Sequence, residues 1–164
     1  MVQQQYWHEL YALKTHINYI ELQLEKAELM DRRIKLFLAI TSSSSIGGWA
    51  IWQNLSIVWA FLIAGSQVVT AILPHLPYAS RIKTYSSVLT ELNSLMVKAE
   101  FKWNVIASGK LNSEEINKAR FDLISIKSKA LDKHIPSTIP SDGKLREESE
   151  KLARDYFDLF YQQQ

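Results

Sequence analysis

The chain has 164 residues, of which 47% are hydrophobic and 22% are charged, and its formal net charge is +2. This length is that of one domain, and so small a charge excess does not by itself indicate a nucleic-acid-binding protein. The absence of cysteine excludes disulfide bonds, thiolate catalysis and cysteine-based zinc sites, and it is compatible with a reducing compartment.

The N-terminal region, residues 1–35, is predicted to be a helix. Its apolar residues recur at alternating spacings of four and three, which is a heptad pattern about three repeats long. Neither proline nor glycine occurs from Met1 to Ile46, so this helix is expected to run unbroken into the apolar segment that follows. The predicted seam consists of Tyr6, Leu10, Leu13, Ile17, Ile20, Leu24 and Ala27.

The next region is free of charge. From Leu36 to Ser80, 45 consecutive residues include no Asp, Glu, Lys or Arg, where the average composition would place about ten. At ~1.5 Å per residue, 36–52 and 55–73 would form helices roughly 25 and 28 Å long, against a hydrocarbon layer of about 30 Å. The sequence therefore predicts a transmembrane hairpin over 36–77, with spans at 36–52 and 55–76.

Basic residues lie on one side of this hairpin. They are Lys26, Arg32, Arg33 and Lys35 before it and Arg81 and Lys83 after it, whereas the connecting Gln53 and Asn54 are uncharged. This positive-inside pattern predicts an inner-membrane protein with both termini in the cytoplasm. The alternative is a buried hairpin in a soluble bundle, because both segments are short for spans and Ser42–Ser45 dilutes the first. The lack of charge on any face favours the membrane.

Small and polar residues within the two spans predict that several copies associate. Small residues let helices approach closely in lipid, and a primary amide such as that of Gln67 is costly there unless it is paired or hydrated. Gln67 either bonds across to a hydroxyl as a structural contact or lines a polar pathway through a homo-oligomer, for which a tetramer is expected. The candidate residues are Thr41, Ser42, Ser45, Gly48, Ala64, Gln67 and Ala71.

Three further helices are predicted in residues 78–164, after Pro74 and Pro77, which mark either a break at the membrane surface or a hinge. The first runs from Tyr78 to about Ser108. The second follows a capping box at Asn112 and Glu115 and ends near His134. The third runs from Lys144 to about Tyr161. The residues expected to face inward in the second helix are Ile116, Ala119, Leu123, Ile126 and Ala130. The third helix is expected to carry Leu145, Leu152, Tyr156 and Leu159 or Phe160 on one side.

The predicted fold class is therefore an all-α membrane protein: a two-helix transmembrane hairpin with a cytoplasmic bundle of the N-terminal helix and three C-terminal helices. No catalytic motif is present, and the four histidines have no metal-ligand spacing, so neither an enzyme nor a cofactor is expected. Basic residues of the helix near 113–134 are either a solvated face or contacts for an anionic ligand. They are Lys118, Arg120, Lys127, Lys129 and Lys133.

In layout the chain resembles the SLATT family of bacterial two-transmembrane effectors. The likeness is carried by the N-terminal helix Tyr6 to Arg33, the charge-free hairpin Leu36 to Pro77 and the C-terminal helix ending in KLREESEKLARDYFDLF. The resemblance implies an oligomeric membrane effector that responds to a partner nucleotidyltransferase, or to its nucleotide or oligonucleotide product, and permeabilises the inner membrane in abortive anti-phage defence.

Three functions remain open from the sequence. The first is a homo-oligomeric channel or pore whose polar faces surround an axis, with the lipid bilayer and copies of itself as partners. The second is a non-conducting membrane anchor or scaffold that holds a partner protein. The third is a holin-like lytic protein, which the long ordered cytoplasmic region disfavours.

Overall fold

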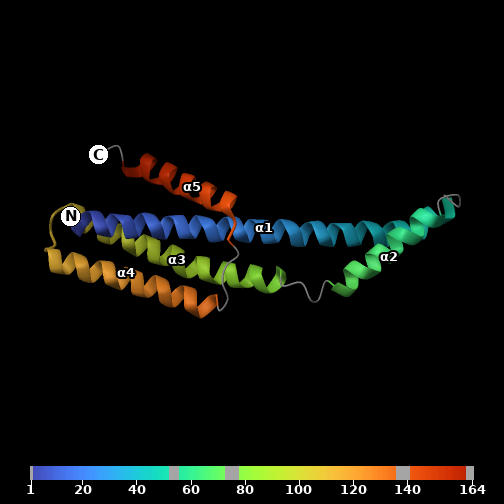
Figure 1. Ribbon diagram of the computed structural model, residues 1–164, viewed down its shortest axis with the longest axis horizontal. Helices are drawn as coiled ribbons and strands as arrows, with labels where there is room; N and C mark the ends of the chain where they lie inside the picture. Colours follow the sequence, from blue (N-terminus) through green and yellow to red (C-terminus); the bar gives the residue numbers. More distant parts are fainter. Residues whose placement is uncertain (1, 52–55, 73–77, 136–140, 162–164) are drawn as a thin grey trace. The chain divides into compact units, whose positions relative to one another are not determined.

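The computed structural model describes residues 2–51, 56–72, 78–135 and 141–161, without the side chains of 41–51, 56, 59, 78 and 79. These residues form five α-helices and no strand (Figure 1). The predicted all-α class is thereby confirmed for the described part of the chain. The helices are α1 (Val2–Ile51), α2 (Ser56–Ile72), α3 (Tyr78–Ala107), α4 (Ser113–His134) and α5 (Gly143–Tyr161).

The helix boundaries follow local sequence signals. α1 is one continuous helix of 50 residues, as the absence of proline and glycine from Met1 to Ile46 predicts. Gly109, just after α3, has a φ of 71°, a left-handed conformation that glycine adopts at little cost. The predicted capping box of α4 is confirmed, because the side chains of Asn112 and Glu115 each accept a 2.9 Å hydrogen bond from the other residue's backbone N–H.

The chain divides into two compact units. The first contains Met1–Leu24 and Lys83–Gln164 and is called the helical body below. It brings together the N-terminal helix and the three C-terminal helices that the sequence assigns to one bundle. The second contains Glu25–Ile82 and is called the apolar unit. Each unit is described by itself.

In the helical body α1 and α3 run antiparallel with their heptad seams facing each other. The Tyr6 hydroxyl donates a 3.1 Å hydrogen bond to the Ala99 carbonyl, and Gln3 donates to the carbonyl of Ile106 at 3.3 Å. Apolar side chains at these seams are withdrawn from water, which is the main stabilising contribution to such a bundle. The buried seam residues include Tyr6, Leu10, Leu13, Ile17, Ile20, Tyr85, Leu89, Leu92, Met96 and Ala99.

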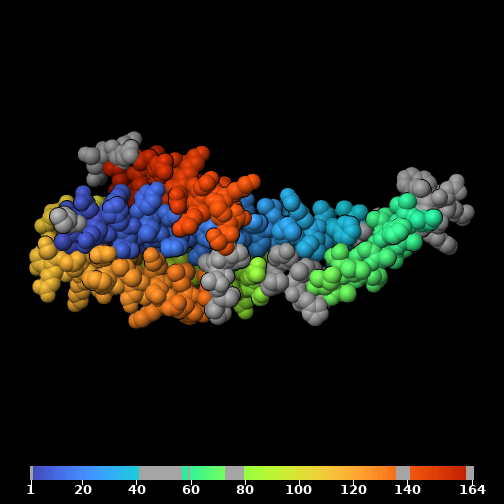
Figure 2. Space-filling view, in the orientation of Figure 1, coloured from blue at the N-terminus to red at the C-terminus, as the bar shows by residue number. Residues whose placement is uncertain are grey.

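The helices α4 and α5 cover α1 from two sides in the space-filling view (Figure 2). An ion pair between Arg120 of α4 and Glu9 of α1 at 3.3 Å, and a 3.2 Å hydrogen bond from the Tyr11 hydroxyl to the Glu150 carbonyl, agree with this arrangement. α1 is therefore the central helix of the body and contacts each of the other three.

The apolar side predicted for α5 is buried only in part, since Leu145 and Tyr156 are half-buried. Leu152, Leu159 and Phe160 are 43%, 64% and 60% exposed, whereas Ser149 and Ala153 are fully buried. Small side chains let α5 approach α1 closely enough for the Asn18 side chain to donate to the Ser149 carbonyl at 3.3 Å. With these small residues at the contact, Leu152, Leu159 and Phe160 lie outward, whereas Phe157 is buried beside them. In α4 the prediction for Ile126 is wrong, since it is 50% exposed, while Ile116, Leu123 and Ala130 are buried as expected.

In the apolar unit the charge-free sequence forms the last part of α1 and all of α2. α2 has 17 residues, a length of about 26 Å, and falls within the predicted span 55–76. Across the described residues, none of the helices combines the length and the apolar character needed to cross a membrane.

Candidate functional site

The described side chains of α2 are almost all exposed. Only Ser66 and Val69 are half-buried, and the hydroxyls of Ser66 and Thr70 donate back to carbonyls of their own helix at 2.8 Å. Ten large apolar residues of the charge-free stretch are more than a third exposed, which is unusual for a chain surrounded by water. They are Leu36, Phe37, Ile40, Ile57, Val58, Phe61, Leu62, Ile63, Val68 and Ile72.

Three of the predicted pathway residues lie on one face of α2. Ala64, Gln67 and Ala71 are three and four residues apart, and all three are exposed. Among the described residues the Gln67 amide makes no hydrogen bond within the chain. An exposed amide on an apolar helix is costly in lipid unless it is paired or hydrated.

The other predicted pathway and hinge residues cannot be placed. Thr41, Ser42, Ser45 and Gly48 belong to α1, but their side chains lie outside the described part of the structure. Pro74 and Pro77 lie outside the described residues altogether.

The five basic residues predicted as anion contacts on α4 do not form one patch. Arg120 pairs with Glu9 and donates to the Gln5 side chain at 3.2 Å, so it joins α4 to α1. Lys133 pairs with Glu91 of α3, which His134 also contacts at 2.9 Å. Hydrogen bonds from these two residues lower the pKa of Glu91. Lys118 and Lys129 are exposed and Lys127 is half-buried.

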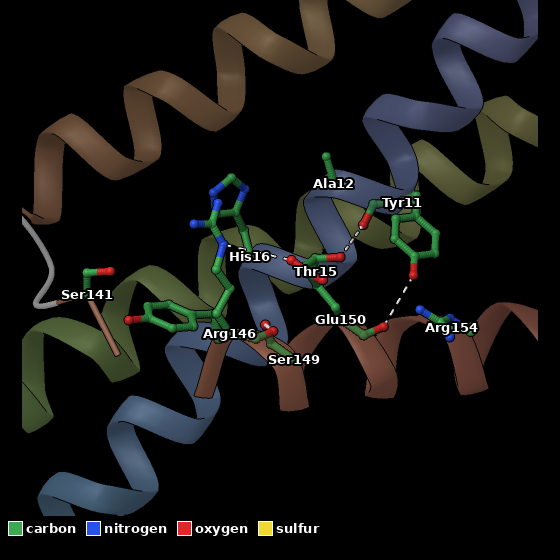
Figure 3. A pocket seen from close by; sticks show the side chains of 10 residues that line it. Tyr11, Ala12, Thr15, His16, Ser141, Arg146, Ser149, Glu150 and Arg154 are labelled. Carbon is green, nitrogen blue, oxygen red and sulfur yellow. Dashed lines mark hydrogen bonds and ion pairs between the residues drawn. The ribbon is translucent and has the colours of Figure 1, made fainter. Parts of the chain in front are cut away.

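A cavity of about 510 Å³ lies between α1 and α5 in the helical body (Figure 3). Its α1 wall includes Tyr11, His16 and Tyr19, and the backbone N–H of Asp142 donates to the Tyr19 hydroxyl at 3.0 Å. The Asp142 carboxylate in turn caps α5 by accepting from the N–H of Lys144 at 3.1 Å. The remaining lining residues are Ala12, Thr15, Ser141, Arg146, Ser149, Glu150 and Arg154.

Positive charge surrounds His16 at this cavity. Burial lowers the pKa of His16 below 6.5, and the charges of Lys127 and Arg146 lower it further. Figure 3 shows the Arg146 and His16 side chains close together, with Arg154 farther along the cavity. A carboxylate, Glu150, lies 3.8 Å from Arg146, but both side chains are more than half exposed. Water therefore weakens this ion pair considerably.

An aromatic cluster occupies the end of the body near the N-terminus. The Trp7 ring lies 4.8 Å from those of Trp103 and Phe157 and 5.2 Å from that of Tyr161, measured between centroids. The Tyr161 hydroxyl donates to Glu100, and burial together with the Glu100 charge raises the pKa of Tyr161 to about 12. These rings contact one another, so they join α1, α3 and α5 as a core extension.

Sequence reasoning missed the cavity between α1 and α5. It did not single out His16, Arg146 or Arg154 as neighbours. One signal was available: Arg146, Glu150 and Arg154 recur every four residues beside the small residues Ser149 and Ala153. Within the described ranges, no three His, Asp or Glu side chains are grouped closely enough to hold a metal ion.

Comparison of the chain with protein-family models, with curated proteins and with solved structures found no match.

Proposed function

We propose that this protein is a homo-oligomeric membrane channel or pore-forming effector of the bacterial inner membrane. The charge-free stretch 36–77 forms its membrane hairpin, and both termini lie in the cytoplasm. The helical body receives a signal, nucleotide-derived by analogy with the SLATT layout, and the assembly permeabilises the membrane in anti-phage defence. A partner nucleotidyltransferase would supply that signal.

One observation carries the proposal: large apolar side chains of the charge-free stretch are exposed. Fully burying such a side chain stabilises a structure by roughly 1.5–3 kcal/mol, and Ile57 and Phe61 are 71% and 75% exposed. Lipid tails would surround these groups without the cost of hydrating them. The helical body, by contrast, buries most of its seam residues.

The length of α2 has to be compared with the thickness of the membrane. A helix of about 26 Å is a few ångströms shorter than a hydrocarbon layer of about 30 Å. Membranes accommodate a short apolar helix by local thinning, by snorkelling of the flanking side chains or by oligomerisation of the protein, each at a modest free-energy cost. The charge-free sequence also continues beyond α2 as far as Ser80.

The exposed Gln67 amide supports assembly of several copies around a polar pathway. In lipid its partners would be amides of neighbouring copies or water in the pathway, with Ala64 and Ala71 allowing close approach on the same face. A tetramer is the expected assembly. The second candidate is a non-conducting anchor that holds a partner protein, in which Gln67 serves only as a contact between helices.

Ion flux from liposomes that contain the purified full-length protein separates these two functions. Gln67→Leu should reduce flux while the oligomer persists, whereas the adjacent Val68→Leu, which exchanges one apolar residue for another, should conduct as the wild type. If Gln67→Leu alters assembly but leaves flux intact, the pathway assignment is wrong. Liposomes that stay impermeable with and without nucleotides would favour the anchor.

A further inference from the structure

The cavity between α1 and α5 has the size and lining of a small-molecule site. Its volume of about 510 Å³ lies within the range of roughly 300–1,000 Å³ usual for ligand pockets. It lies open to solvent between two helices that hydrogen bonds hold together, from Tyr11 to the Glu150 carbonyl and from Asn18 to the Ser149 carbonyl. All its lining residues belong to the helical body, so the site does not depend on how the two units are placed.

The hydroxyl groups of the cavity are largely engaged within the fold. Thr15 donates to the Tyr11 carbonyl at 3.0 Å, and Ser149 donates to that of Arg146 at 2.7 Å. The strongest donors left for a ligand are the guanidinium groups. Arg146 has only the water-weakened contact with Glu150, and Arg154 forms no ion pair with any described carboxylate. The cavity thus offers cationic donors more than neutral ones.

The charges facing His16 come from both neighbouring helices. Lys127 belongs to α4 and Arg146 to α5, and the cavity contains one carboxylate, that of Glu150. Cations gathered around a neutral imidazole repel one another unless an anion joins them. A phosphate group suits this end of the cavity, because a guanidinium binds its oxygens with two parallel hydrogen bonds.

The rest of the cavity is suited to a flat ring. Tyr11 and Tyr19 line the cavity from α1 with aromatic rings. Ala12, which lies next to Tyr11, lines it with only a methyl group. Arg154 lies eight residues beyond Arg146 on α5, a rise of about 12 Å. A guanidinium at that distance is placed to stack on an unsaturated ring rather than to share the phosphate.

We propose that the cavity between α1 and α5 binds a small organic phosphate with a flat unsaturated ring. Arg146 and His16 hold the phosphate, and the ring lies along Tyr11 toward Arg154. The inference deepens the proposed function and rests on it for its role as a signal site. The two are tested separately, because ion flux reports on the channel and ligand binding on the helical body. Within the proposed channel this cavity would be the place where a signal is received.

Phenyl phosphate is the probe, with inorganic phosphate and phenol as its separate parts. Full-length protein in detergent is titrated at pH 7 and low salt by calorimetry, while the ring signals of His16 are followed by NMR. We expect saturable binding of phenyl phosphate that is tighter than that of either part. The pKa of His16 should rise on binding, since the phosphate charge offsets those of Lys127 and Arg146.

The variants are ordered by their distance from the phosphate. Arg146→Gln should weaken binding about 10- to 100-fold, the effect typical of losing a charge-assisted pair. Arg154→Gln should weaken it only a few-fold. Lys151→Gln removes a cation from an exposed position of the same helix outside the cavity and should bind as the wild type. All three side chains are exposed, so the variants are expected to remain folded.

Two results would overturn the proposal. One is the absence of saturable phenyl phosphate binding up to about 10 mM. The other is equal weakening by Arg146→Gln and Lys151→Gln, which would indicate general charge attraction rather than a site. Competition with nanodiscs that contain phosphatidic acid distinguishes a lipid headgroup from a soluble phosphate as the natural source. Either source satisfies the phosphate assignment.

Discussion

Leu13 in α1 is fully buried among seam residues of the helical body, whereas Phe61 in α2 leaves 75% of its surface exposed. Both residues are large and apolar, and both lie on helices predicted from the sequence. The difference is in their surroundings: the body provides its own apolar environment, while the charge-free stretch needs one from outside. Secondary structure alone therefore does not say whether an apolar helix is surrounded by protein or by lipid. Matched substitutions in the two units test this comparison.

The largest effect is expected from identical truncations in the two units. Leu13→Ala should destabilise the helical body by about 3 kcal/mol, because it leaves a cavity in a packed seam. Leu62→Ala in α2, where the side chain is 39% exposed, should change the body's stability by less than about 0.5 kcal/mol. Hydrogen exchange of the slowest α3 amides measures both. Equal acceleration by the two variants would mean that the units are not independent.

The next effect tests the close contact between α5 and α1. Ser149→Leu should cost roughly 1–3 kcal/mol, because a leucine cannot fit where α5 meets α1. Glu148→Leu, one residue earlier and exposed, should cost little. The rate of protease cleavage within α5 measures how readily this helix detaches from α1. If the Ser149 variant is no more readily cleaved than the Glu148 variant, the close contact between the helices is not as described.

These two tests mark how far the sequence alone leads. All five helices, the unbroken α1 and the capping box at Asn112 follow from heptad spacing, glycine placement and cap chemistry, which are local signals. The inward face of α5 does not follow. Its leucines at 145, 152 and 159 suggest one face, but Ser149 and Ala153 permit a closer approach on another, and only tertiary packing decides between the two.

The candidate sites also divide into those that local sequence signals reveal and those that only tertiary packing reveals. The charge-free stretch is visible in the sequence because it is one continuous run, and Gln67 because it is a polar amide within an apolar segment. The cavity between α1 and α5 brings His16 together with Arg146, 130 positions away, and Lys127. No spacing rule connects residues so far apart until the helices are placed.

A smaller effect concerns the acid sensitivity of the body. The pKa of Glu91 is lowered from 4.5 in the folded protein, so the carboxylate contributes stability above pH 4.5 that is lost as the pH falls through the lowered value. Glu91→Gln should therefore make the melting temperature less dependent on pH below about 4.5. An unchanged acid slope would show that the pairs with Lys133 and His134 contribute nothing to folding.

The smallest effect is expected at His16. Its pKa lies below 6.5 in the folded state, so the unfolded chain takes up the proton more readily and stability falls as the pH drops from 7 through the lowered pKa. His16→Gln should remove this part of the pH dependence. Melting curves of the variant and the wild type between pH 7 and 5 measure the difference, and an unchanged pH dependence would contradict it.

The central claim, that lipid surrounds the charge-free stretch, is tested most directly by two spin labels. The chain has no cysteine, so Phe61→Cys and Phe101→Cys each introduce a unique site, and these phenylalanines are 75% and 71% exposed. In liposomes, the label at 61 should collide mainly with dissolved oxygen and the label at 101 mainly with a water-soluble nickel chelate. A label at 61 that is as accessible to the chelate as the label at 101 would contradict the account.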